Sequence, residues 1–191
     1  LRSAWIAWRA GIRERVGYMR NGRSLLLTVG LKPRRNQGKY EPMSAVDYYL
    51  ELLSAMGVHI QSRQPELYTT AQGELAADGV WKNFGWNSGH SVIALNTGGA
   101  YGAAKHWPNE HSVKLAQNLA QKGHRVLVLC GPKEVEVARE IETLSNSEFI
   151  RSMADQDLSL EASKACIRRS KLLVSTDSGP RHIASAFDVP T

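Results

Sequence analysis

From Ser91 to the end of the chain, segments that are apolar throughout alternate with stretches whose apolar residues recur at helical spacing. The apolar segments are SVIALN, HRVLVLCG, EFIRSM and KLLVST. Strands that are apolar along their whole length are buried on both faces, and helices of about 10–15 residues between them favour parallel pairing. The sequence therefore predicts an α/β fold with a Rossmann-like parallel sheet over residues 91–191.

The first 90 residues have a different pattern. Over residues 1–57 we expect the end of a helix (SAWIAWRAGI), a short strand (RVGY), a second apolar stretch (NGRSLLLTVGL), a basic loop (KPRRNQGKYEP) and a helix (SAVDYYLELLSAMG) with Ser44 as its cap. Residues 58–90 are polar, with a short helical stretch, and we expect them to connect two domains and to begin the second. Because the first residues are already helical in pattern and another strand is due after FDVP, we expect an internal piece of a longer protein.

Composition excludes several classes of protein. Hydrophobic residues make up 42% and charged residues 22% of the chain, as in globular proteins. The net charge of +6 fits an acidic ligand or an anionic membrane surface, but Lys and Arg are spread out, which disfavours nucleic-acid binding. Cys130 and Cys166, the only cysteines, lie in apolar segments and are expected to be buried reduced thiols. The histidines match no zinc spacing, and DQD at residues 155–157 is read as a helix-capping loop, so no metal site is predicted.

Glycines and a lysine follow the first apolar strand of the second region, in NTGGAYGAAKHWP. Gly98, Gly99 and Gly102 allow the backbone to approach a ligand, and Lys105 offers a positive charge suited to a phosphate. The spacing matches neither a Walker loop nor GxGxxG. A flexible loop with a solvated lysine explains the same residues equally well.

The second strand ends in LCGPKE, where Gly131 and Pro132 turn the chain into a helix. We expect Lys133 and Glu134 in the first turn of that helix. A carboxylate there stabilises the helix N-terminus without any ligand, and it could also accept hydrogen bonds from ribose hydroxyls.

The last strand ends in STDSGPRHIASAF. Ser178 can cap the following helix, Gly179 can bring its N–H close to a ligand, and Pro180 suits a first turn. The N–H groups of that turn and the helix dipole favour a phosphate, so this junction is either a helix cap or a phosphate site. Asp177 would hold a sugar hydroxyl or a backbone group. His182 could donate to a phosphate or could simply be packed or solvated.

Taken together, the segments GGAYGAAKHWP, VLVLCGPKE and SLEASKACIRRSKLLVSTDSGPRHIASAF, with RVGYMRNGRSLLLT and DYYLELLSAMG before them, resemble glycosyltransferase family 9, the ADP-heptose-dependent heptosyltransferases of lipopolysaccharide core synthesis. The resemblance covers most of the chain in the family's order, although residues 58–90 match only loosely. It implies a GT-B fold of two Rossmann-like domains. Residues 1–57 would be the C-terminal part of the acceptor-binding domain, residues 58–90 the interdomain connection, and residues 91–191 a truncated nucleotide-sugar-binding domain.

The same resemblance implies an inverting, metal-independent transfer of a heptose from ADP-heptose to the lipid-linked inner core, with no cofactor, at the cytoplasmic face of the inner membrane. The alternatives are another GT-B nucleotide-sugar transferase or epimerase, and a non-catalytic nucleotide-binding domain. The acidic catalytic base is expected before Leu1, so we expect this piece alone to be inactive.

The resemblance also implies roles for particular residues. Lys105 would contact the diphosphate, Asp177 the heptose, and Glu134 or its neighbour the ribose. Ser178 and Gly179 would offer backbone donors to the phosphates. The full set of implied donor-binding residues is Tyr101, Lys105, Glu134, Asp177, Ser178, Gly179 and His182. Arg34 and Arg35, in the basic loop, either are solvated or meet an acidic acceptor.

Overall fold

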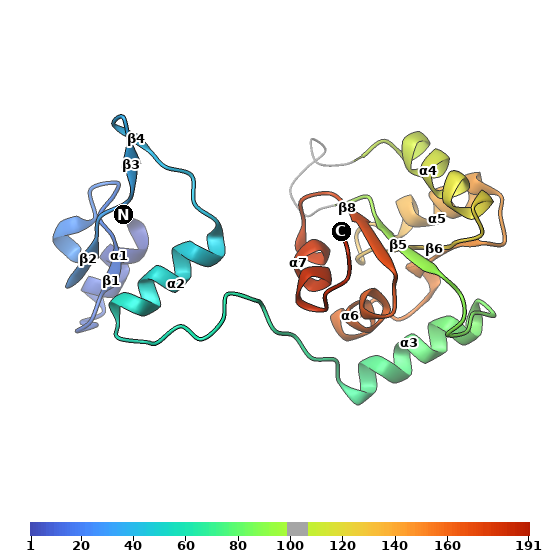
Figure 1. The fold of residues 1–191 in the computed structure, drawn as a ribbon, viewed down its shortest axis with the longest axis horizontal. Helices are drawn as coiled ribbons and strands as arrows, with labels where there is room; N and C mark the ends of the chain where they lie inside the picture. The colour runs from blue at the N-terminus through green and yellow to red at the C-terminus, as the bar shows by residue number, and fades with distance from the viewer. Residues whose placement is uncertain (99–106) are drawn as a thin grey trace. The chain divides into compact units, whose positions relative to one another are not determined.

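A computed structural model of the chain describes residues 1–98 and 107–191, which divide into two units, Leu1–Gln64 and Pro65–Thr191 (Figure 1). The boundary falls inside the range 58–90 that the sequence assigns to a connection. Helix α3 (Ala71–Asn83), from the end of that range, packs against α6 (Leu160–Arg168) and so belongs to the second unit. The assignment of the two regions to acceptor and donor binding stays a prediction.

The second unit is built on a parallel sheet. Its strands are β5 (Val92–Asn96), β6 (Arg125–Val128), β7 (Ile150–Ser152) and β8 (Leu172–Ser175). They lie in the order β7-β6-β5-β8, and every neighbouring pair is parallel. Each of the four apolar segments contains one strand, and every residue of β5 is buried, so the predicted parallel sheet is confirmed.

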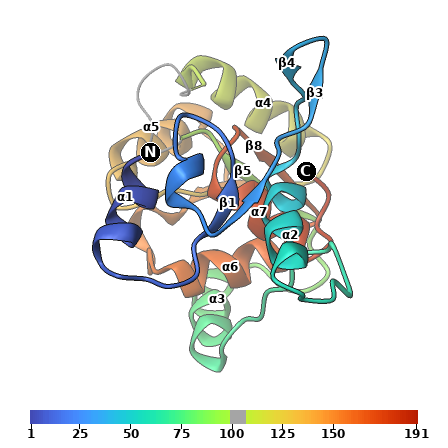
Figure 2. The same cartoon turned by 90° about the vertical axis from the view of Figure 1, so that its left-hand side faces the viewer.

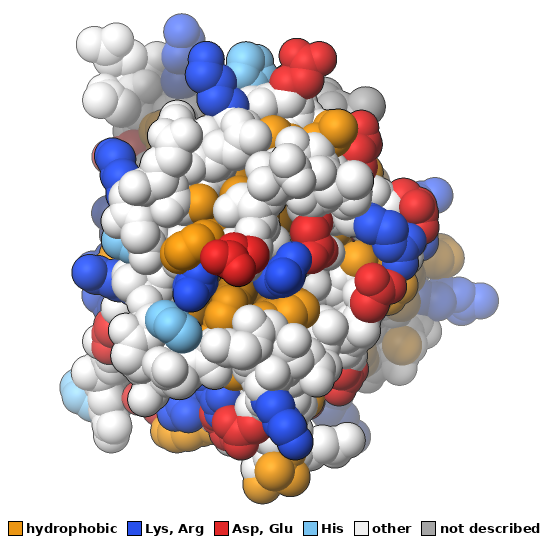
Figure 3. Space-filling view, turned by 90° about the vertical axis from the view of Figure 1, so that its right-hand side faces the viewer, with side chains coloured by type: hydrophobic (Ala, Val, Ile, Leu, Met, Phe, Trp, Pro, Cys, Tyr) orange, Lys and Arg blue, Asp and Glu red, His pale blue; other side chains and the backbone are white. Residues whose placement is uncertain are grey.

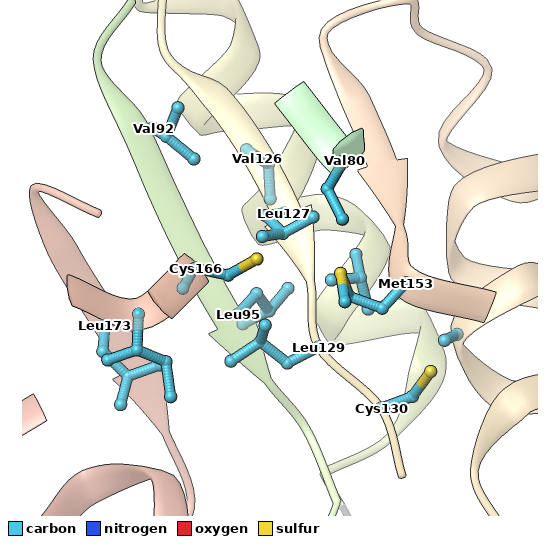
Figure 4. Packing of buried hydrophobic residues seen from close by; sticks show 14 of the residues in the cluster. Val80, Val92, Leu95, Val126, Leu127, Leu129, Cys130, Met153, Cys166 and Leu173 are labelled. Carbon is cyan, nitrogen blue, oxygen red and sulfur yellow. The ribbon is translucent and has the colours of Figure 1, made fainter. Parts of the chain in front are cut away.

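Helices cover both faces of this sheet (Figure 1). Helix α4 (Asn109–Gln121) packs against α5 (Val135–Ser145), while α6 contacts both α3 and α7 (Gly179–Ala186). Figure 4 shows part of the apolar cluster between these layers, including Leu95, Leu127 and Cys166, which are fully buried. Leu144, in the last turn of α5, is 54% exposed and does not join this cluster.

The first unit contains two small sheets and two α-helices (Figure 2). Its elements are α1 (Arg2–Arg9), β1 (Val16–Tyr18), the 3-10 helix η1 (Ser24–Leu26), β2 (Val29–Leu31), β3 (Arg35–Asn36), β4 (Lys39–Tyr40) and α2 (Ala45–Ala55). Strands β1 and β2 pair in parallel. Ser44 caps α2 as predicted, because its hydroxyl accepts the N–H of Asp47 at 3.1 Å.

The basic segment after β2 is a hairpin rather than a loop. Arg35 pairs with Tyr40 and Asn36 with Lys39, so only Gln37 and Gly38 form the turn. Both turn residues have positive φ, 48° and 80°, as a two-residue hairpin turn of this hand requires. The prediction of an irregular loop was therefore wrong, because a glycine at the second turn position allows the strands to pair.

The face of the second unit seen in Figure 3 carries Lys, Arg, Asp and Glu side chains that are interspersed rather than separated by sign. In the described residues, we find no helix with the length and apolar character needed to cross a bilayer.

Candidate functional site

The strand order creates a crevice at the carboxyl edge of the sheet in the second unit. Strand β5 has β6 on one side and β8 on the other. After β5 the chain forms β6 and β7 on one side of β5, and it then crosses to form β8 on the other side of β5. Ligands of open α/β sheets bind at such a switch point, outside the carboxyl ends of the strands. The loops after β5 and β8 both leave the sheet here, since Asn96 and Ser175 are in register.

A pocket of about 350 Å³ opens at this edge. Residues from the ends of β5 and β6 and from the starts of α5, α6 and α7 line it. Its apolar lining includes Leu129, Cys130, Leu158, Leu160, Ile167 and Ile183, and its polar lining is Asn96, Glu134, Ser163 and Ser178. An apolar pocket with a few convergent polar groups is the usual form of a small-molecule site.

Glu134 reaches from the N-cap of α5, after β6, toward Gly98, which follows β5. One carboxylate oxygen, Oε2, accepts the N–H of Gly131 at 3.0 Å. The other, Oε1, lies over Gly98, where an added Cβ would come within 2.0 Å of it. Gly98 is therefore the residue that leaves room for this carboxylate. The prediction that Glu134 sits in the first turn of α5 was off by one position, because Pro132 and Lys133 form a turn and Glu134 is the N-cap residue.

Asn96 was not singled out by the sequence reasoning, yet it connects the elements around the pocket. Its side-chain NH₂ faces the carbonyl oxygen of Gly98 at 3.1 Å, Ser175 Oγ at 3.2 Å and Ser178 Oγ at 2.9 Å. Thr176 Oγ1 also donates to the Gly98 carbonyl, at 2.7 Å. The available signal was a lone amide as the last residue of an otherwise apolar strand.

Ser178 and Gly179 begin α7 at the rim of the same pocket. Ser178 holds the N-cap position, but its hydroxyl makes no capping hydrogen bond. The expected cap is therefore wrong, because Asn96 donates to that oxygen and Pro180 has no N–H to offer. Among the described residues, no acceptor receives the Gly179 N–H, and a Cβ added there would meet nothing within 4 Å.

Two other predicted site residues lie apart from this pocket in the described structure. Asp177, directly after β8, has a side chain that is 70% exposed and forms an ion pair with Arg181 at 2.9 Å. His182 lines a separate hollow of about 430 Å³ together with Arg181 and Ser185. The structure thus brings Glu134, Ser178 and Gly179 together, but not Asp177 or His182.

Tyr101 and Lys105 lie outside the described residues, so their predicted roles stay predictions. Beyond them, the N–H of Trp107 donates to the carbonyl oxygen of Thr97 at 3.2 Å. That hydrogen bond connects the start of the segment leading into α4 with the carboxyl end of β5.

Arg34 and Arg35 lie in the first unit. Arg34 forms an ion pair with Glu51, and both line a pocket of about 400 Å³. The guanidinium of Arg35 lies over the ring of Tyr40, 4.6 Å from its centroid. Of the two, Arg34 alone is part of that pocket.

The described residues hold no group of three or more His, Cys, Asp or Glu side chains that could bind a metal ion. Burial raises the pKa of the Cys130 thiol to about 11 and the pKa of the Cys166 thiol to about 12. Both thiols are therefore protonated at neutral pH and unsuited to nucleophilic chemistry.

Comparison with known proteins gives consistent results over the whole chain. The sequence profile of glycosyltransferase family 9 (heptosyltransferase) matches residues 1–191. Lipopolysaccharide heptosyltransferase 2 of Salmonella typhimurium is 31% identical over an alignment 154 residues long, which covers 76% of this chain and 43% of that protein.

Among solved structures, ADP-heptose LPS heptosyltransferase II of E. coli has a TM-score of 0.71 at 26% identity, over 99% of this chain and 58% of that one. The family 9 glycosyl transferase of Veillonella parvula has a TM-score of 0.76 at 21% identity, over 99% and 52%. The chain thus spans about half the length of these relatives and shares their GT-B architecture.

Proposed function

Because the chain belongs to glycosyltransferase family 9, we propose that the whole protein transfers a heptose from ADP-heptose to the inner core of lipopolysaccharide. The transfer would invert the anomeric carbon and need no metal ion or other cofactor. The observation that carries this proposal is the pocket at the β5–β8 switch point. A carboxylate, an apolar lining and the N–H of Gly179, which has no acceptor among the described residues, converge there. The E. coli relative, which is 26% identical, is an ADP-heptose LPS heptosyltransferase.

The nucleoside would occupy the apolar part of the pocket. Leu158 and Leu160 offer flat apolar contacts to a purine, and Leu160 is 66% exposed, as a side chain at the mouth of a pocket can be. Glu134 Oε1 would accept a ribose hydroxyl while Oε2 keeps its bond to Gly131. A carboxylate held in place by a backbone N–H loses little freedom when it binds a second donor.

The diphosphate would lie at the start of α7. The N–H of Gly179 and the positive end of the helix dipole favour an anion there. Lys105 stands two residues before Trp107, whose N–H is hydrogen-bonded to Thr97 at the carboxyl edge of the sheet. We therefore assign the ammonium group of Lys105 to the diphosphate as well. Negative charge on ADP grows as the bond to the anomeric carbon breaks, so these donors bind the transition state more strongly than the ground state.

The heptose would extend from the diphosphate toward Asp177, which follows β8 directly and is exposed at that edge. We do not extend the proposal to His182, because it lines a different hollow. Arg34 and Arg35 are assigned to the phosphates or carboxylates of the acceptor. Because that acceptor is linked to lipid, we place the protein at the cytoplasmic face of the inner membrane.

A donor panel tests this proposal in the whole protein. ADP-heptose and UDP-sugars are each incubated with and without the lipid-linked inner-core acceptor, in the presence of a metal chelator, and the anomer of the product is determined by NMR. We expect ADP-heptose to be the one donor that is used, transfer to require the acceptor, and the product to have the inverted anomeric configuration. Equal use of UDP-sugars would support a different GT-B transferase. Sugar conversion without acceptor would indicate an epimerase, and ADP binding without turnover a non-catalytic domain.

A further inference from the structure

Asn96 is a buried amide at the end of the central strand, and only 6% of the residue is exposed. Its orientation follows from its neighbours: the Gly98 oxygen is a carbonyl and can only accept, so the NH₂ group faces it. The same NH₂ group then faces the hydroxyls of Ser175 and Ser178. Asn96 therefore links β5 to β8 and to the first residue before α7.

The hydroxyl of Ser178 could either cap α7 or bond to groups outside that helix. A serine at an N-cap position normally accepts an N–H of the second or third helical residue. Here the second residue is Pro180, which leaves the N–H of Arg181 as the one group that Ser178 could cap. Instead, Ser178 Oγ accepts from Asn96 at 2.9 Å, its shortest hydrogen bond, while the carbonyl oxygen of Thr176 and Ser175 Oγ each lie 3.3 Å from it.

The N–H of Arg181 consequently has only a long contact, 3.3 Å, to the Ser178 carbonyl oxygen. The N–H of Gly179 has no acceptor in the described part of the chain. The first turn of α7 thus keeps N–H groups for an acceptor from outside, although a residue able to cap the helix stands at its start.

We propose that Asn96 is a positioning residue for the donor diphosphate. By holding the Ser178 hydroxyl and the Gly98 carbonyl, it prevents α7 from capping itself and keeps the N–H groups of the first turn available to a phosphate. The inference rests on the proposed function, because it names which residue prepares that site. Asn96 contacts no phosphate itself and acts through Ser178.

A double-mutant cycle measured by calorimetry with ADP, on the whole protein, tests this inference. In Asn96→Ala the Ser178 hydroxyl is released and can cap Arg181, so we expect the Kd for ADP to rise about tenfold. Ser178→Ala alone leaves the N–H groups open and should change the Kd less than about threefold. In the double variant no cap can form, so it should bind ADP more tightly than Asn96→Ala does. Equal or weaker binding by the double variant would overturn the inference.

Two further variants make this result interpretable. In Asn96→Ser the serine hydroxyl keeps a buried donor near Gly98 but is too short to hold Ser178, so this variant should bind ADP as weakly as Asn96→Ala. Asn96→Ser replaces Asn96→Ala in the cycle if the alanine variant does not fold. The matched control is Asn83→Ala, which removes an exposed hydrogen bond to Gln156 of 2.9 Å and should leave the Kd unchanged. A large loss of ADP binding in Asn83→Ala would mean that the cycle reports stability, and the inference would fall.

Amide hydrogen exchange without ligand separates the inference from the proposed function. The Arg181 N–H should exchange more slowly in Asn96→Ala than in the wild type, because the hydroxyl now caps it, and should exchange fast again in the double variant. An unchanged Arg181 amide in Asn96→Ala would refute the role of Asn96 whatever ADP does. If the Arg181 amide responds as expected but the wild-type protein binds no ADP, the proposed function fails and the control of the cap by Asn96 stands.

Discussion

The substitution Gly98→Ala tests whether the Glu134 carboxylate is a ligand-binding group. An added Cβ would lie 2.0 Å from Glu134 Oε1 and 2.7 Å from its Cδ, whereas real Cβ contacts stay above 3.0 Å. The carboxylate oxygen must therefore move by about 1 Å or more to reach the 3.0 Å limit. That displacement would weaken the 3.0 Å hydrogen bond that the carboxylate accepts from the Gly131 N–H.

The cost to folding should be small and the cost to binding large. Glu134 is half-buried and its carboxylate is the end of a flexible side chain, so we expect about 1 kcal/mol of lost stability, less than a buried charged hydrogen bond contributes. If the carboxylate holds the ribose, its displacement removes a hydrogen bond of about 1.5–3 kcal/mol. The Kd for ADP should then rise roughly ten- to hundredfold.

Calorimetry with ADP on Gly98→Ala, Glu134→Ala and the double variant provides the measurement. The two single variants should lose similar affinity, and the double variant should be no worse than Glu134→Ala, because the alanine at 98 then has nothing to displace. Gly79→Ala in α3 is the matched control, since a Cβ there, unlike one at Gly98, meets nothing within 4 Å. The reasoning is refuted if Gly98→Ala binds ADP normally, or if it weakens binding equally in the Glu134→Ala background.

Three further predictions concern stability and the acceptor. Burial raises the pKa of Cys166 to about 12, so the thiol of the unfolded chain ionises first, near pH 8.5. The free energy of unfolding should therefore fall above that pH, by up to about 1.4 kcal/mol per pH unit. In urea titrations this fall with pH should be less steep in Cys166→Ala than in the wild type, and an equally steep fall would contradict the prediction. Burial raises the pKa of Glu74, but hydrogen bonds, including those from Arg169, outweigh it and hold that pKa below its usual value. Stability from this pair is therefore lost as pH falls through the lowered pKa. Arg169→Met should cost about 2 kcal/mol at pH 7, and the cost should shrink as the pH is lowered through that pKa in the same titrations. A cost that does not change with pH would exclude the ion pair as the cause. Replacing Arg34 and Arg35 by Glu should raise the KM for the acceptor several-fold while the Kd for ADP is unchanged, and an unchanged KM in steady-state assays would remove them from the acceptor site.

Much of the second unit could be predicted because its signals are local. The apolar segments became the four strands, and Gly98, Glu134, Ser178 and Gly179, which follow three of them, lie at one edge, since parallel strands bring their carboxyl ends together. Glu134, Ser178 and Gly179 met in one pocket for that reason. The motif segments also carried the resemblance to the family whose profile matches the chain.

The details that were missed depend on partners distant in sequence. Serine is a common helix-capping residue, but the hydroxyl of Ser178 accepts its shortest hydrogen bond from Asn96, on a strand 82 residues earlier. His182 is one turn from Ser178, but the helix turns its side chain toward a different hollow. The hairpin of residues 35–40 was not predicted, because basic residues usually indicate a solvated loop. Its turn depends on the positive φ of Gln37 and Gly38.

The central claim is that the start of α7 receives the donor diphosphate, and Gly179→Ala tests it most directly. A Cβ at residue 179 meets nothing within 4 Å, so the variant should fold as stably as the wild type, while its methyl group occupies the space in front of the helix. Calorimetry with ADP on the whole protein should show a Kd raised about tenfold or more in Gly179→Ala and unchanged in Gly79→Ala. Wild-type affinity for ADP in the stably folded Gly179→Ala protein would contradict the account.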